Sequence, residues 1–230
     1  MYAGLIKLGQ KEHMQDLYRR GHLYLNTFDF FRQLEIGADG RGDPDEYISE
    51  YYCGPAMAGL KIGLKIQKVD KTVQTLELTP ETGLAEFKTD YGQKTYSHLF
   101  CASLMVVEDI RKTGQLIVPC NIAANKDWMI IIYDVREFLN RIKTACEDAG
   151  WGPIEARPVE YFDASNYGGT VGCFKKSNVY KHQVEWRLAV SCPNTTEAQS
   201  LFLGSLEGIA TEPFLAIDAF KEPVIIGENQ

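Results

Sequence analysis

Two acidic segments carry side chains that suit chemistry at a charged or sugar-like substrate. They are Arg41-Gly42-Asp43-Pro44-Asp45-Glu46 and Gln183-Val184-Glu185-Trp186-Arg187. Polarity alternates with period two in the second segment, so a strand there would place Gln183, Glu185 and Arg187 on one face. An amide, a carboxylate and a guanidinium in a row need partners when protein covers them. The second segment therefore forms either a solvated outer face or the lining of a polar cleft.

Each segment also has a purely structural interpretation. Asp43-Pro44 is a common turn opener, and acids in such a loop are often only solvated. Charges on a strand can protect an exposed sheet edge. A metal-dependent nuclease is a third alternative, which we rank last because the usual neighbouring catalytic lysine is missing, and we expect no metal. It would need four carboxylates to converge on Mg²⁺, namely Asp43, Asp45, Glu46 and Glu185.

Other reactive side chains give weaker signals. Ser103 lies where a strand could present its hydroxyl to a cleft, although a satisfied buried serine fits equally well. The histidines have no metal-like spacing, and the sequence marks no Ser-His-Asp order. The six cysteines are scattered and predict neither a zinc site nor a disulfide framework. Two basic patches, Arg19-Arg20 and Lys175-Lys176 with Lys181, suit a small anionic ligand.

Composition limits the class of protein. With 230 residues, 45% of them hydrophobic and 24% charged, we expect one globular domain spanning 1–230. A net charge of -7 argues against binding duplex nucleic acid by phosphate contacts. The N-terminus lacks the features of a secretory signal, and no apolar run is long enough to span a bilayer, so we expect a cytoplasmic protein without a membrane partner.

The elements that must position these residues follow from periodicity and turn signals. We expect a helix over 10–20 that ends at Gly21, a helix from Thr27 as N-cap to Leu34, and a loop over 37–46. A capping box of Asp134 and Glu137 predicts a third helix, which ends at Gly150. Strands are expected at about 2–8, 22–26, 58–69, 72–78, 95–107, 128–133, 157–162, 183–191, 200–204 and 222–226.

These elements predict an α+β fold with a mixed or antiparallel sheet and few helices, because strands and helices do not alternate regularly. The strands at 58–69 and 72–78 should form a hairpin turned at Asp70-Lys71. No glycine-rich phosphate loop follows any strand, which disfavours a Rossmann or P-loop nucleotide site.

The Gln183-x-Glu185 pattern after a basic loop resembles the catalytic loop and strand of ADP-ribosyltransferases. In that family the glutamate is the catalytic carboxylate, and a Gln or Glu two residues earlier helps to choose the acceptor. By period two, Gln183 and Glu185 would point into the same cleft. The resemblance implies a split sheet of the ADP-ribosyltransferase type, with NAD as the substrate.

The wider layout is similar to a poorly characterised family of bacterial and phage proteins thought to share that fold. The matching positions are Lys7, Asn26-Thr27, Asp43-Pro44 with Glu46, Lys176, Tyr180, Glu185 and Arg187. Gln183 replaces the family's first Glu, Gly42 replaces its Asn, Glu46 comes one position early, and the family's central Trp and Tyr have no counterpart at 115–127.

The resemblance implies a role for each matched residue. Glu185 would stabilise an oxocarbenium-like ribose, and Arg187 would keep it ionised. Lys7, Arg32 or Arg187 would hold the pyrophosphate, and Asn26 with Thr27 the nicotinamide or ribose. Asp43, Glu46 and Ser103 complete the expected NAD-binding set.

The leading hypothesis is therefore an NAD-dependent mono-ADP-ribosyltransferase that modifies a macromolecule, in the setting of phage and bacterial conflict. The alternative is a non-catalytic binding protein on the same fold that captures a protein or a nucleotide.

Overall fold

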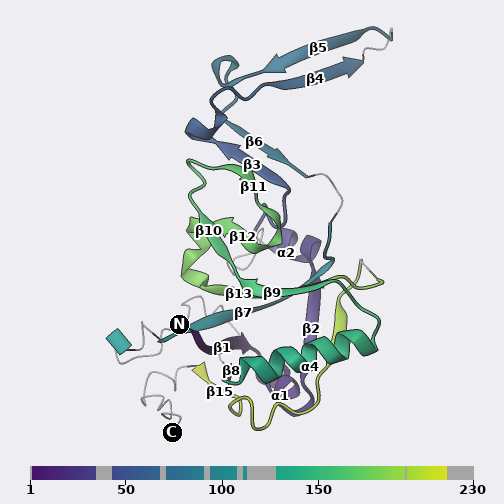
Figure 1. Cartoon of the computed structure of the whole chain (residues 1–230), viewed down its shortest axis with the longest axis vertical. Helices are drawn as coiled ribbons and strands as arrows, with labels where there is room; N and C mark the ends of the chain where they lie inside the picture. Colours follow the sequence, from purple (N-terminus) through teal and green to yellow (C-terminus); the bar gives the residue numbers. More distant parts are fainter. Residues whose placement is uncertain are drawn as a thin grey trace.

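The structure is a computed structural model that describes residues 2–34, 43–67, 71–90, 94–107, 111–112, 128–194 and 196–216. An eight-stranded sheet forms its body (Figure 1), with the order β14-β2-β7-β1-β8-β15, with β13 paired to β7 and with β9 paired to β13. Its strands are β1 (Tyr2–Gly9), β2 (His22–Thr27), β7 (His98–Val106), β8 (Trp128–Ile132), β9 (Ile154–Pro158), β13 (Glu185–Val190), β14 (Gln199–Phe202) and β15 (Phe214–Leu215). Every pairing in this sheet is antiparallel.

Helices α1 (Lys11–Arg20) and α4 (Val135–Asp148) supply side chains to the main core on one face of this sheet. Helix α1 ends at Gly21, whose φ of 61° is left-handed. A Cβ there would lie 2.3 Å from the carbonyl oxygen of Gly204, so the position requires glycine. Helix α4 begins where Asp134 accepts a hydrogen bond from the Glu137 amide at 3.0 Å. Its buried stripe is Phe138, Ile142 and Cys146.

The central strand β7 has a gap along one edge. β13 pairs with β7 from His98 to Ser103, whereas the opposite edge is shared by β1 and β2. β2 pairs with His98 and Leu99, and β1 begins to pair at Ser103. Among the pairings that the structure describes, residues 100–102 thus pair with β13 alone. The sheet splits at this gap, between the start of the β1 pairing and the end of the β2 pairing.

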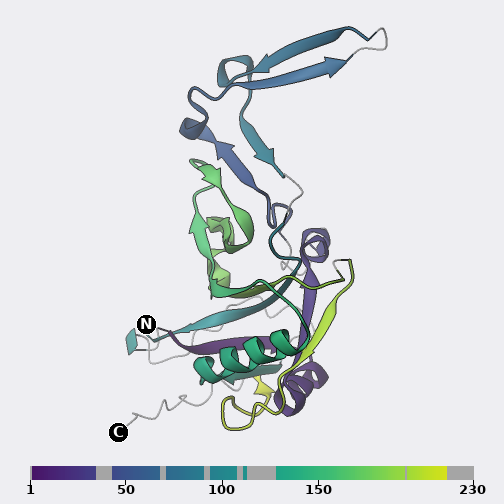
Figure 2. The ribbon, with the colours of Figure 1, turned by 45° about the vertical axis from the view of Figure 1, so that its right-hand side comes forward.

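The rest of the chain extends from the body along the long axis of the molecule. Figures 1 and 2 show small sheets stacked above β13, and a hairpin that projects furthest from the main sheet. These elements are α2 (Phe28–Leu34), β3 (Glu50–Cys53), β6 (Glu86–Thr89), β11 (Gly168–Thr170), the parallel pair β10 (Glu160–Phe162) and β12 (Lys175–Ser177), and the hairpin β4 (Ile62–Gln67) and β5 (Val73–Leu78). Four 3₁₀ turns are also described: η1 (Gly54–Met57), η2 (Pro80–Thr82), η3 (Gly172–Phe174) and η4 (Asn178–Gln183).

Most of the predicted elements are confirmed. The chain is α+β, with few helices and mostly antiparallel sheets. The Thr27 hydroxyl accepts a hydrogen bond from the Phe30 amide at 3.2 Å, and β4 pairs with β5 as an antiparallel hairpin. The five described cysteines are free. No helix within the described ranges is long and apolar enough to cross a bilayer. The expected strand at 222–226, loop residues 37–42 and Asp70 lie outside the described residues.

Several predicted strands have different limits in the structure: β4 begins at Ile62 rather than at 58, and β7 begins at His98 rather than at 95. In place of the strand expected at 157–162 the structure has two strands, β9, which ends at Pro158, and β10, which begins at Glu160. Between them, the Val159 amide donates to the Glu185 carbonyl at 2.9 Å. The strand expected from 183 begins instead at Glu185, because Val184 is left-handed with a φ of 43°. A left-handed residue cannot continue a pleated strand, so Gln183 belongs to η4.

Candidate functional site

Arg187 lies at the centre of a buried ion-pair network. Its guanidinium donates to both oxygens of Glu46, at 2.6 and 2.7 Å. It also donates to both oxygens of Glu185, at 2.9 and 3.3 Å, and to the Cys173 carbonyl. These five contacts match the five N–H donors of a guanidinium. Arg187 is 1% exposed, so its charge is neutralised entirely by neighbours inside the protein.

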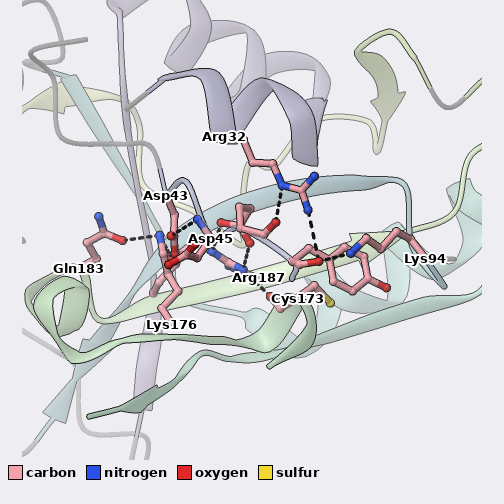
Figure 3. A network of polar contacts seen from close by, with 11 residues as sticks. Arg32, Asp43, Asp45, Lys94, Cys173, Lys176, Gln183 and Arg187 are labelled. Carbon is pink, nitrogen blue, oxygen red and sulfur yellow. Dashed lines mark hydrogen bonds and ion pairs between the residues drawn. The ribbon is translucent and has the colours of Figure 1, made fainter. Parts of the chain in front are cut away.

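The turn that carries Glu46 is held by helix α2. Arg32 donates from Nε to the Glu46 carbonyl at 2.7 Å and from Nη2 to the Tyr47 carbonyl at 3.4 Å (Figure 3). The same nitrogen binds Asp90 at 2.9 Å. Within the turn, the Asp43 carboxylate accepts from the Asp45 amide at 2.9 Å. Arg32 therefore fixes the backbone from which Glu46 reaches Arg187.

Lys176 joins the network from strand β12. Its ammonium donates to Gln183 at 3.1 Å and to Glu185 at 3.3 Å (Figure 3), and it lies 4.6 Å from the centre of the Tyr180 ring. The side chain is only 3% exposed. Nearby, the Tyr161 hydroxyl of β10 accepts from the Glu185 amide at 2.9 Å. The first residue of β13 is thus bonded through both its side chain and its backbone.

The charges in this cluster set its protonation. Burial alone would raise the pKa of Glu185, but Arg187 and Lys176 outweigh burial and lower that pKa to about 2. The pKa of Asp43 moves the other way, to about 7, because burial and the nearby Glu46 outweigh Lys176 and Arg187. Glu185 is therefore a carboxylate at every physiological pH, as expected for an acid beside Arg187.

The structure brings Gln183 and Glu185 together, but for a different reason from the one predicted. Period-two alternation fails, because Gln183 lies in η4 before the strand begins. The two side chains meet instead on the ammonium of Lys176. Gln183 in η4 and Glu185 at the start of β13 thus come together through Lys176, whereas the sequence predicted that a continuous strand would bring them together.

Ser103 and Asn26 share the sheet face of Glu185. Ser103 lies directly opposite Glu185 in the β7–β13 register. Asn26 pairs with Leu99, which is four residues from Ser103 along β7 and therefore on the same face. Paired residues of an antiparallel sheet point to the same side. These two predicted site residues therefore lie on the same face of the sheet as Glu185.

Lys7 and Thr27 belong to the other face by alternation. Lys7 follows Leu5, which packs into the core beneath α4. The Lys7 ammonium lies 4.5 Å from the centre of the Phe100 ring and donates to the Cys101 carbonyl at 2.6 Å. That carbonyl belongs to the stretch of β7 that pairs with neither β1 nor β2, so Lys7 fills the split in the sheet. Thr27 caps α2.

Several expectations are corrected by these contacts. Arg187 cannot hold a pyrophosphate as predicted, because its five donors are occupied by Glu46, Glu185 and Cys173. The basic patch that included Lys176 is not an exposed anion site, because Lys176 is buried against Glu185. The contacts of Lys176 with Gln183 and Glu185 were not predicted, because the sequence does not show that this lysine is buried.

The converging carboxylates do not form a metal centre in the part of the chain that the structure describes, where no group of three or more His, Cys, Asp or Glu residues is placed to hold an ion. Arg187 lies between Glu46 and Glu185, where a metal ion would be needed, and Asp45 pairs with Lys88 at 2.8 Å. The nuclease alternative loses its structural basis.

A scan against protein-family models and searches of curated proteins and of solved structures find no match to this chain.

Proposed function

We propose that this protein transfers ADP-ribose from NAD to a macromolecular acceptor, with Glu185 as the catalytic carboxylate on a split sheet of the ADP-ribosyltransferase type. The observation that carries the proposal is the state of Glu185. It is a carboxylate with a pKa of about 2, held at the start of β13 by Arg187 and Lys176. Lys176 also donates to Gln183. Most buried carboxyl groups resist ionisation, so this charge is maintained by its surroundings.

The chemistry explains why such a charge is useful. Cleavage of the bond between the nicotinamide nitrogen and C1′ of the ribose leaves neutral nicotinamide and an oxocarbenium-like sugar. A fixed carboxylate stabilises that positive charge as it develops. A nucleophile of the acceptor then forms a bond to C1′ and loses its proton. Gln183 lies beside Glu185, where its amide would orient the acceptor.

Access of NAD to Glu185 requires the covering segment to move. Glu185 is 7% exposed, and its carboxylate contacts Lys176 of β12, the strand that leads into η4. Lys176 donates to Glu185 at 3.3 Å, and Val179 in the segment that follows β12 is 66% exposed. The proposal therefore includes an opening in which Lys176 leaves Glu185 and the dinucleotide takes its place.

The other NAD contacts in the proposal follow from the sheet face. Asn26 and Ser103 share the face of Glu185 and are the polar groups assigned to the ribose or nicotinamide. Lys7 belongs to the opposite face, so its assigned contact with the pyrophosphate requires its ammonium to leave the Cys101 carbonyl and reach through the split. Arg32, Asp43 and Glu46 act as positioning residues, because they hold the turn and Arg187 rather than an open surface.

Labelled NAD tests this proposal in a cell lysate. The protein should transfer label to specific acceptors detected by mass spectrometry, and Glu185→Gln should lower that transfer at least ~100-fold through lost electrostatic stabilisation. Glu155→Gln is the matched control, since Glu155 is also paired with an arginine, Arg157 at 2.7 Å, but lies outside the network. Equal labelling by wild type and Glu185→Gln would remove Glu185 from the mechanism.

The non-catalytic binding protein remains a second candidate because of two observations. Glu185 and Arg187 satisfy each other inside the protein, as a purely structural network would. In addition, the β4–β5 hairpin projects from the body (Figure 2) and exposes Val73 by 60% and Leu76 by 42%. An isolated two-stranded hairpin is marginally stable in water, so a partner that covers it would suit this arm.

A further inference from the structure

A second polar cluster lies at the outer end of the sheet, away from Glu185 in the strand order. His22 Nδ1 is 2.5 Å from Asp16 Oδ2, and His22 Nε2 is 2.8 Å from Ser200 Oγ. The imidazole thus has a carboxylate on one nitrogen and a serine hydroxyl on the other. This is the arrangement in which a histidine takes the proton of a serine nucleophile while an acid fixes the ring.

The fold brings these three side chains together from distant positions. Helix α1 carries Asp16, and the left-handed Gly21 turns the chain so that His22 opens β2 beside it. β14 pairs antiparallel with β2, placing Phe202 opposite His22 and Ser200 opposite Tyr24. Leu23, Leu25 and Leu201, on the alternate positions, are buried in the core. The cluster therefore occupies the outer face of the same strands.

Neighbouring groups fix the imidazole and offer an apolar floor. The Phe202 ring stacks on His22 with centroids 4.6 Å apart and planes at 19°, and Tyr24 meets the imidazole edge-on at 6.4 Å. Arg20 binds the other oxygen of Asp16 at 3.2 Å. Tyr24 and Phe202 are 58% and 48% exposed. Exposed aromatic rings beside a nucleophile suit an apolar acyl group.

The edge of the sheet supplies hydrogen-bond donors for a developing oxyanion. The Leu203 amide donates to the Gly21 carbonyl at 3.1 Å, which fixes the phase of the β14–β2 ladder. Because amides alternate in direction along an antiparallel strand, those of Ser200 and Phe202 point away from β2. β14 is the terminal strand in the sheet order, so this direction is its outer edge. The amide of the serine itself therefore lies beside the attacking oxygen without being used by β2.

We propose that Asp16, His22 and Ser200 form an acyl-transfer site that hydrolyses small esters with an apolar acyl group. Ser200 Oγ attacks the ester carbonyl and gives its proton to His22 Nε2. The C–O bond to the alcohol then breaks, and the alcohol leaves with that proton. Water, deprotonated by His22, releases the acid and restores the serine. Asp16 accepts the hydrogen bond from Nδ1–H throughout, which leaves Nε2 of the neutral imidazole able to take the serine proton and stabilises the imidazolium that forms. This activity is independent of NAD and of Glu185.

A fluorophosphonate probe tests the proposal directly. Ser200 Oγ should form a bond to phosphorus with loss of fluoride, giving one adduct that peptide mass spectrometry locates at Ser200. Ser200→Ala should abolish the adduct, and His22→Gln should slow labelling by ~100-fold or more, the size of a general-base contribution. Ser205→Ala, which removes another exposed serine of the same region, should label at the wild-type rate.

Turnover of p-nitrophenyl acetate gives the second readout, with Ser205→Ala expected to behave as wild type. Thermal melting of each variant checks that the fold is retained. Absence of a Ser200 adduct in the folded wild-type protein would overturn the proposal. So would an equal labelling rate in wild type and His22→Gln, because that serine would then react without its base.

Discussion

Replacing Arg187 by methionine is expected to lower the free energy of unfolding by about 3 to 5 kcal/mol. Methionine provides an apolar side chain of similar length, but Glu46 and Glu185 lose the cation that they share. Both carboxylates are at least 93% buried, so water cannot replace the lost partner. Urea unfolding at pH 7 measures this change, with the slope of free energy against urea used to check that the transition remains two-state.

Arg157→Met is the matched control for this experiment. Arg157 lies directly opposite Arg187 in the β13–β9 register and also binds two carboxylates, Glu155 and Glu160. Its side chain is 39% exposed, so its loss should cost about 1 kcal/mol or less. If the two methionine variants unfold at the same urea concentration, the buried network is not the stabilising centre that we describe.

Replacing Asp43 by asparagine is expected to stabilise the protein near pH 8 by about 2 to 4 kcal/mol and to have little effect near pH 4. The folded-state pKa of Asp43 is raised to about 7, above its ordinary value of 3.8. Below pH 4 the carboxyl group is protonated in both states and nothing is lost. Between pH 4 and 7 the unfolded chain ionises first, so the cost of keeping Asp43 in the fold grows as pH rises. Asparagine removes that cost, and its side-chain oxygen can still accept the hydrogen bond from the Asp45 amide.

The measurement is urea unfolding of wild type and Asp43→Asn at intervals from pH 4 to pH 8. Glu185 does not interfere, because its stabilising effect is complete above about pH 5 and its partial loss at lower pH is the same in wild type and Asp43→Asn. Asp45→Asn is the control, since Asp45 is 37% exposed and its surface pair is worth about 1 kcal/mol or less. A stability difference between wild type and Asp43→Asn that does not change with pH would contradict the raised pKa.

Local features of the chain were predictable from the sequence. Helix α4 has a cap at Asp134 and an apolar stripe at helical spacing, and both signals lie within a few residues of the structure that they specify. The end of α1 at Gly21 and the β4–β5 pairing depend on equally local signals. These elements form where the sequence places them because no distant contact opposes the local preference.

The start of β13 was not predictable in the same way. Alternation of polar and apolar residues from Gln183 to Val190 predicts one continuous strand, yet Val184 adopts a left-handed conformation that is unfavourable for a β-branched residue. The cause is tertiary, since Lys176 binds both Gln183 and Glu185. A residue pattern does not report a constraint imposed by another strand.

The candidate site was predicted as two separate segments, and the contact between them was not. Glu46 and Arg187 are 141 residues apart in the chain, and nothing in either segment states that one guanidinium would bind both glutamates. The triad-like cluster was missed for the same reason, since His22 and Ser200 are 178 residues apart. Spacing identifies residue types that can do chemistry, but only the sheet register shows which of them meet.

The central claim is that the carboxylate of Glu185 assists cleavage of NAD. Release of nicotinamide by the purified protein, followed by chromatography over time, tests it most directly. We expect release by wild type and by Glu155→Gln at similar rates, and by Glu185→Gln at least ~100-fold more slowly. If wild-type protein at millimolar NAD releases no nicotinamide above the uncatalysed rate, or if Glu185→Gln releases it as fast as wild type, the claim is contradicted.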